Sequence, residues 1–111
     1  MRLLLLALSA AAVGTLAFTQ AQAASFSCDG ASLPAERAVC GNRRLSALDE
    51  RLAYWYGRAQ VRARYFDQTE WLRNAQRAWL ANRNACGMSA WCLRAKYHER
   101  IRRLKNYVEH V

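Results

Sequence analysis

All four cysteines of this chain follow an N-terminal segment that has the composition of an export signal. They are Cys28, Cys40, Cys86 and Cys92. Exported proteins enter oxidising compartments in which cysteines pair, and small exported domains depend on such cross-links because their apolar cores are thin. The cysteines therefore predict a small domain that is stapled by two disulfides and works outside the cytoplasm.

The N-terminal segment has the three parts of a secretory leader. Arg2 supplies the charged start, residues 3–17 form an apolar run, and Ala21-Gln22-Ala23 is a small-residue site that suits signal peptidase. We expect cleavage after Ala23. The chain is thus divided into a signal peptide, residues 1–23, and one mature domain, residues 24–111.

The same pattern predicts a soluble mature protein, located in the periplasm or secreted. No segment after the leader offers the roughly 18 uninterrupted apolar residues that a membrane span requires, so no transmembrane anchor is expected after processing. A retained leader helix that acts as an anchor is the less favoured alternative. Lipid anchoring is not expected, because Cys28 follows Ser25-Phe26-Ser27 instead of standing directly at the cleavage site.

The mature domain is strongly basic. Loss of the leader with Arg2 lowers the formal net charge from +9 to +8. A solvated helix surface in an arginine-rich proteome explains this charge without any function. The functional alternative is an anionic partner, because guanidinium groups bind carboxylates and phosphates bidentately. In the cell envelope such partners include acidic glycans, lipid headgroups and carboxylate-lined clefts.

Apolar residues recur at spacings of three and four, which predicts an all-α fold. The longest predicted helix runs from Asn42 to about Tyr65, and a shorter one runs from about Leu33 to Cys40 with Pro34 in its first turn. The apolar stripe of the long helix contains Leu45, Leu48, Leu52, Trp55 or Tyr56, and Ala59.

Two more helices are predicted downstream. Asp67 and Glu70 have the spacing of a capping box, so a helix is expected to begin there and to end near Cys86-Gly87. Its inner face is expected to hold Leu72, Ala75, Trp79, and Asn82 or Arg83. Ser89 is predicted to cap the last helix. The inner face of that helix is expected to hold Leu93, Tyr97, Ile101, Leu104 and Val108. The result is a small antiparallel helical bundle of one short and three longer helices.

Four cysteines permit three pairings, and the sequence alone does not choose among them. The predicted helix ends favour a Cys86–Cys92 bond, which would lock the corner between the last two helices. Cys28 and Cys40 would then tie the N-terminal segment to the short helix. Zinc binding is disfavoured, because the spacings are C-x11-C and C-x5-C instead of two C-x-x-C pairs.

An ordered set of short motifs resembles the LprI-like lysozyme-inhibitor domain. The first half contributes Phe26-Ser27-Cys28, Glu36-Arg37-Ala38-Val39-Cys40 and Leu45-Ser46-Ala47-Leu48-Asp49. The second half contributes Gln76-Arg77-Ala78-Trp79-Leu80, Arg83-Asn84-Ala85-Cys86, and Cys92-Leu93 followed by Tyr97, Arg100, Ile101 and Leu104. The resemblance covers nearly the whole of residues 24–111. It implies an exported all-helical domain of bacterial envelopes whose named activity is the inhibition of lysozyme.

Inhibition of lysozyme suggests which residues could contact a partner. Lysozyme cleaves its glycan between two carboxyl groups in a cleft, and an inhibitor could present arginine to them beside aromatic anchors. The candidate partner-binding residues are Arg73, Arg77, Trp79, Arg83, Trp91 and Trp55. Alternatively, Trp79 belongs to the core, and Arg77 and Arg83 bridge helices through Asp49 or Glu70. A net charge of +8 would slow binding to a basic lysozyme. The charge is a weaker argument against an endogenous murein hydrolase as the target.

Catalysis is not predicted. His98 and His110 have no catalytic motif around them, and Asp49-Glu50 point to different sides of a helix. No cofactor, metal or nucleic acid is expected as a ligand. The second functional hypothesis is a basic adapter that binds anionic envelope surfaces, either lipid headgroups or acidic glycans, through Arg100, Arg102, Arg103 and Lys105.

Overall fold

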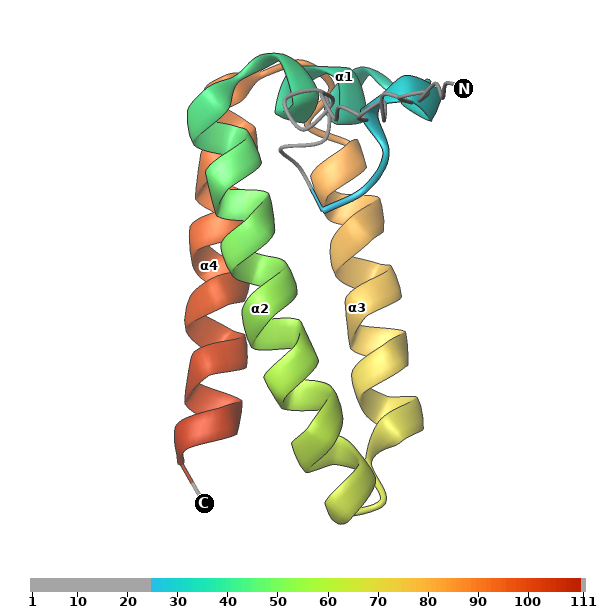
Figure 1. Ribbon diagram of the computed structural model, residues 1–111, viewed down its shortest axis with the longest axis vertical. Coiled ribbons are helices and arrows are strands. Elements are labelled where there is room, and N and C mark those ends of the chain that lie inside the picture. The colour runs from blue at the N-terminus through green and yellow to red at the C-terminus, as the bar shows by residue number, and fades with distance from the viewer. Residues whose placement is uncertain (1–24, 111) are drawn as a thin grey trace, which may run out of the picture.

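The computed structural model describes residues 25–110 as a helical bundle (Figure 1). The elements are the 3-10 turn η2 (Cys28–Gly30) and the helices α1 (Pro34–Gly41), α2 (Arg43–Tyr65), α3 (Thr69–Asn84) and α4 (Ala90–Glu109). The predicted leader and its cleavage site lie outside the described residues. Within residues 25–110 the predicted all-α class, with one short and three longer helices, is confirmed.

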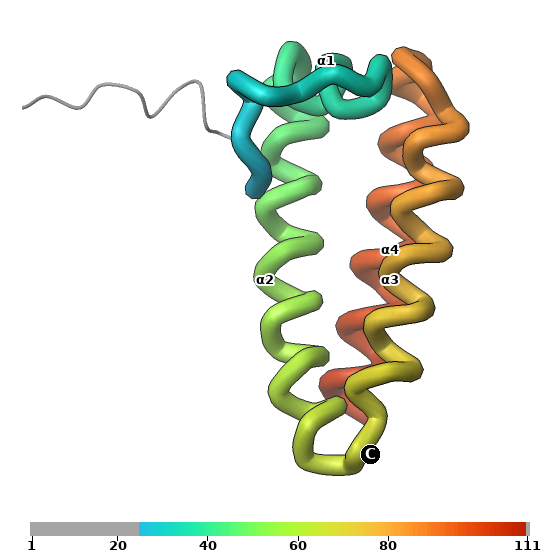
Figure 2. The backbone as a smooth tube through the Cα atoms, turned by 90° about the vertical axis from the view of Figure 1, so that its right-hand side faces the viewer, coloured from blue at the N-terminus to red at the C-terminus, as the bar shows by residue number. Residues whose placement is uncertain are grey.

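Helices α2, α3 and α4 form an up-down-up bundle, and α1 lies across one end of it (Figure 2). α2 and α4 therefore run in the same direction and pack side by side, while α3 runs antiparallel to both. The core is made of the buried apolar side chains Ala35, Val39, Leu45, Leu48, Leu52, Ala59, Ala63, Leu72, Trp79, Leu93, Tyr97, Ile101 and Leu104. Most of these residues occupy the predicted stripes, whereas Ala75 and Val108 lie half-buried at the stripe edges.

α1 begins at Pro34, one residue after the predicted start at about Leu33, and Ser89 caps α4 as predicted. Asn42 caps α2. The Oδ1 atom of Asn42 accepts hydrogen bonds from the backbone N–H groups of Arg44 and Leu45, at 2.9 and 3.1 Å. The Oγ atom of Ser89 accepts one from the N–H of Cys92 at 3.2 Å. Both side chains satisfy donors that the first helical turn would otherwise leave unpaired.

The predicted capping box at Asp67 is wrong. Asp67 lies in the left-handed backbone region, with φ of 58°, and α3 begins only at Thr69. The N–H groups of Asp67 and Gln68 donate to the carbonyls of Arg64 and Ala63, at 3.4 and 2.6 Å. This is the hydrogen-bond pattern of a Schellman motif, so Asp67 ends α2 instead of starting α3. A short polar side chain tolerates the left-handed region, which explains why aspartate suits a helix end as well as a helix start.

Two disulfides are present, and they are the favoured pair. Cys28 bonds to Cys40, and Cys86 bonds to Cys92. The first ties the N-terminal segment to α1. The second closes the connection between α3 and α4, where α3 ends at Asn84, slightly earlier than predicted, and Gly87 takes a φ of +60°.

Candidate functional site

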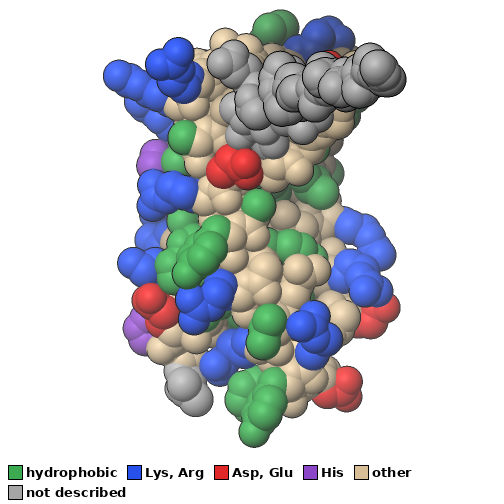
Figure 3. Space-filling view, viewed as in Figure 1, with side chains coloured by type: hydrophobic (Ala, Val, Ile, Leu, Met, Phe, Trp, Pro, Cys, Tyr) green, Lys and Arg blue, Asp and Glu red, His purple; other side chains and the backbone are tan. Residues whose placement is uncertain are grey.

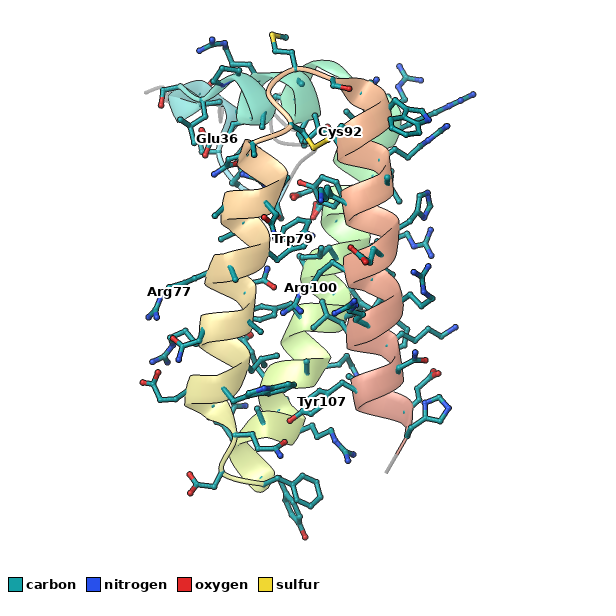
Figure 4. All side chains as sticks on the ribbon, turned by 180° about the vertical axis from the view of Figure 1, so that it is seen from behind. Glu36, Arg77, Trp79, Cys92, Arg100 and Tyr107 are labelled. Carbon is teal, nitrogen blue, oxygen red and sulfur yellow. A yellow bond between two sulfur atoms is a disulfide. The ribbon has the colours of Figure 1, made fainter. Side chains whose placement is uncertain are left out.

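The α3–α4 connection forms a stapled corner, which we define as residues 86–92. Its disulfide holds a short loop at one end of the bundle, and Cys92 lies in the first turn of α4 (Figure 4). Trp91 projects from this corner with 77% of its surface exposed. Trp91 and Arg94 of α4 face Arg44 of α2 across a shallow cleft of about 230 Å³. The sequence-predicted contact residue Trp91 is therefore exposed, lies in the first turn of α4 inside the disulfide-closed ring, and is flanked by two cations.

Arg73 and Arg77 lie exposed on the outer side of α3. Arg73 is 3.4 Å from the carboxylate of Glu70, and Arg77 donates to the Oδ1 atom of Asn74 at 2.7 Å. Figure 4 shows Arg77 pointing away from the bundle. These arginines are accessible, but they do not share a surface with the cleft between α2 and α4.

Trp79 and Arg83 lie inside the bundle, which corrects their choice as contact residues. Their exposed fractions are 7% and 4%. The indole N–H of Trp79 donates to the backbone carbonyl of Lys96 at 3.1 Å, and its ring packs edge-on against Tyr97 at 5.1 Å. The physical reason is that a large aromatic on an apolar stripe is removed from water, as the alternative reading of Trp79 held.

Arg83 belongs to a buried polar network that joins three helices and the N-terminal segment. The Tyr97 hydroxyl donates to Oδ1 of Asp49 at 2.6 Å, and Nη1 of Arg83 donates to the Tyr97 oxygen at 3.2 Å. The guanidinium of Arg83 also lies 4.0 Å from Asp49. Both the N–H and the hydroxyl of Ser25 donate to Oδ2 of Asp49. Each buried charge is thus paired, as a low-dielectric interior requires.

The network explains why an acidic residue, Asp49, stands on the buried side of α2. From the sequence, Asp49 was expected only as a possible bridge to an arginine. Asp49 follows Leu48 and precedes Leu52 by three residues, so it stands on the buried side of α2. An acid on an apolar stripe is a signal for a buried partner, but it does not identify Arg83 as that partner. Tyr97 was expected as an ordinary core residue, and no sequence signal indicates that it lies between the two charges.

Burial, together with the nearby Asp49 carboxylate, raises the pKa of Tyr97 above its ordinary value of 10.0. Above about pH 10 the folded protein therefore retains a phenol proton that the unfolded chain releases. The contribution of Tyr97 to the free energy of unfolding is fully present below about pH 10 and is lost as the pH rises further. Tyr97→Phe is expected to lose about 1–3 kcal/mol of stability at neutral pH. Its stability should also fall less steeply between pH about 10 and about 11. Urea unfolding of both proteins measures this, and parallel pH profiles would contradict it.

Arg100 does not share an exposed face with Arg102, Arg103 and Lys105, which corrects that prediction. Its side chain lies between α3 and α4 (Figure 4), where Nε donates to Oε1 of Gln76 at 3.0 Å. Burial lowers the pKa of this guanidinium. Arg103 pairs with Glu99 at 3.6 Å. Consecutive helical residues are separated by about 100°, so these cations cannot all point the same way.

Trp55 is half-buried on the side of α2 that faces α4. The guanidinium of Arg58 lies 5.7 Å from its ring centre, and the Nζ atom of Lys105 lies 5.9 Å from it. The flat ring is therefore covered by cations from two helices. Trp55 and Trp91 are both on the α2–α4 side of the molecule, and Arg73 and Arg77 are not.

An exposed aromatic end at the α2–α3 turn was not predicted from the sequence. Tyr65 is 82% exposed, and Phe66, Trp71 and Val61 are also exposed there. Hydrophobic side chains are visible at this end of the molecule in Figure 3. The adjacent Tyr65-Phe66 pair just before a turn was the available signal.

The described residues offer few groups for other chemistry. Within residues 25–110, His, Cys, Asp and Glu side chains do not gather in threes that could hold a metal ion. Over the same residues, every helix is too short or too polar to cross a membrane.

The fold and these sites define a small, disulfide-stapled, all-α protein with a tryptophan exposed on a cross-linked corner. The chain belongs to the LprI lysozyme-inhibitor family: the family model described as Lysozyme inhibitor LprI matches residues 28–104. No curated protein and no solved structure matches the chain. The matched region contains both disulfides, the stapled corner and every member of the buried network except Ser25. The family description implies a protein partner.

Proposed function

We propose that this protein is exported, loses its leader after Ala23, and inhibits lysozyme or another murein-cleaving enzyme through the stapled corner. Trp91 carries the proposal, because a largely exposed tryptophan at a helix start that a disulfide holds in place is what an anchor in a partner's pocket requires. Membership of the LprI family supports an enzyme as the partner. The two disulfides support export, since such bonds persist in oxidising compartments.

The surroundings of Trp91 fit a carboxylate-lined cleft. Arg44 and Arg94 flank the indole, and both are exposed. Guanidinium groups form bidentate hydrogen bonds with carboxylates, such as the two that lysozyme uses for catalysis. Because Trp91 lies in the first turn of α4 beside the Cys86–Cys92 disulfide, binding removes little backbone conformational entropy. The corner can therefore combine an aromatic anchor with two charge-assisted contacts.

The net charge favours one kind of target over another. A domain of charge +8 is repelled by a basic lysozyme and attracted by an acidic hydrolase. The field is screened over about 8 Å at physiological salt, so it affects the rate of association more than the final contacts. An acidic murein hydrolase of the same envelope is the target that the charge favours.

The test is an inhibition assay with oxidised residues 24–111 against a panel of lysozymes and endogenous murein hydrolases. We expect one or more enzymes to be inhibited. Trp91→Ala should raise the inhibition constant by roughly 30-fold or more, because loss of a central tryptophan anchor costs about 2 kcal/mol or more.

Trp71→Ala is the matched control, since Trp71 is also exposed but lies near the opposite end of the bundle. It should inhibit as the unmodified protein does. If every enzyme of the panel stays fully active in molar excess of the protein, inhibition is abandoned. If Trp91→Ala inhibits as strongly as the unmodified protein, the stapled corner is not the site.

A further inference from the structure

Four cations from two parallel helices lie on one side of the bundle, and we call them the α2–α4 basic face. They are Arg51 and Arg58 of α2 and Arg102 and Lys105 of α4, and all four are exposed. The contact between Lys105 and the Trp55 ring fixes this side of α4 against this side of α2. Toward the stapled corner, Trp91 and Arg94 line a cleft with Arg44, which also places this side of α4 beside this side of α2.

The spacing of these cations follows the helix repeat. Arg51 and Arg58 are seven residues apart, which is about two turns and about 10 Å along α2. Arg102 and Lys105 are three residues apart and so lie on one side of α4. Because neighbouring helix axes lie about 8–10 Å apart, the cations form two rows on a broad surface instead of a single file.

Two exposed acidic side chains, Glu50 and Glu109, border this face. Glu50 lies about 100° around α2 from Arg51 but only one turn before Tyr54, so it borders the aromatic part of the face. Glu99 is paired with Arg103 beside the α3–α4 cleft, and Glu70 is on α3. Glu109, in the last turn of α4, is four residues after Lys105 and therefore lies on the same side of α4 at the end of the face. Figure 3 shows Lys and Arg side chains following the α4 edge of the molecule.

Aromatic side chains lie among the cations. Tyr54 is 56% exposed and packs edge-on against Trp55 at 5.1 Å. Nη1 of Arg58 donates to the Tyr54 hydroxyl at 3.0 Å and its guanidinium covers both rings. Tyrosine and tryptophan have an apolar body and a polar edge, which suits the boundary between lipid headgroups and acyl chains.

We propose that the α2–α4 basic face binds the surface of an anionic lipid bilayer, with phosphate groups on its cations and Tyr54 at the headgroup level. A broad array of cations with an amphipathic aromatic matches a plane of phosphates better than a single extended polymer. This binding is independent of enzyme inhibition and would hold the protein at the envelope membrane.

The experiment is cosedimentation of oxidised residues 24–111 with vesicles of phosphatidylglycerol and phosphatidylethanolamine, and with phosphatidylcholine vesicles. We expect binding to the anionic vesicles at low salt that weakens strongly at high salt, and no binding to phosphatidylcholine. The variant Arg51→Gln, Arg58→Gln, Arg102→Gln, Lys105→Gln should bind several hundred-fold more weakly, at about five-fold per cation.

A matched control removes the same charge from other sides of the bundle. It carries glutamine in place of four exposed arginines: Arg64, Arg73, Arg77 and Arg103. This control should keep its affinity within about ten-fold of the unmodified protein, because its arginines lie away from the membrane.

Three results would overturn the proposal. They are no binding to anionic vesicles at low salt, equal losses in the two variants, and binding to an acidic polysaccharide without binding to vesicles. An enzyme-inhibition assay of the same proteins separates this proposal from the inhibitor proposal, because that function is assigned to Trp91 and its neighbours.

Discussion

Replacing Asp49 with alanine is expected to lower the free energy of unfolding by about 3–5 kcal/mol, because it leaves the buried Arg83 without its carboxylate. Tyr97 and Ser25 also lose their acceptor in the same step. A small domain has a total stability of about 5–15 kcal/mol, so the variant should be close to unfolding at physiological temperature. Chemical denaturation followed by circular dichroism measures the loss.

Two further variants separate the charge from the shape of the site. Asp49→Asn keeps an acceptor for Tyr97 and removes the negative charge, so it should lose less than Asp49→Ala. The double variant Asp49→Leu, Arg83→Met replaces the ion pair by apolar groups and should be more stable than Asp49→Ala alone. A loss of less than about 0.5 kcal/mol for Asp49→Ala, the range of an ordinary surface substitution, would show that the network does not support the fold.

Removal of both disulfides is expected to cost roughly 5 kcal/mol. The bonds join cysteines 12 and 6 residues apart, and on the loop-entropy estimate their losses are about 3 and about 2 kcal/mol. The thin core of a domain of this size cannot replace that contribution. The variant with all four cysteines replaced by serine should therefore be largely unfolded. Reduction of the unmodified protein should shift its denaturation midpoint to a much lower denaturant concentration.

The two pairs can be compared by replacing one at a time. Loss of Cys28–Cys40 should be the more damaging, because its loop is longer and it tethers the segment that brings Ser25 to Asp49. Loss of Cys86–Cys92 should leave the bundle folded and loosen the corner around Trp91. Equal denaturation midpoints with and without reductant would show that the cross-links do not stabilise the fold.

The helices could be predicted because their signals are local. Leu45, Leu48 and Leu52 mark the buried side of α2, and Ser89 marks the start of α4, through contacts within a few residues. The turn at Asp67 was misread for the same reason. An aspartate before a helix and an aspartate in a left-handed helix end look alike in sequence, and backbone hydrogen bonds to α2 distinguish them.

The candidate site was predicted less completely. The Cys86–Cys92 disulfide around Trp91 was favoured from the predicted helix ends, with five residues between the two cysteines, although the sequence alone left three pairings open. Arg83 was predicted as a partner-binding residue, yet it pairs with Asp49 inside the bundle. Arg100 was predicted on an exposed basic face, yet it lies between α3 and α4. The direction of a long basic side chain depends on the neighbouring helix, and the sequence does not state which helix that is.

By itself the sequence determined that this is an all-α domain, where its helices lie, and that its cysteines can pair at two helix ends. These properties depend on side-chain periodicity and capping, which act over three to six residues. Only the tertiary structure decided that Asp49, Tyr97 and Arg83 meet, and that cations of α2 and α4 share one face. The physical reason is that both outcomes depend on the rotation of packed helices about their axes, which is set by contacts between residues far apart in the chain.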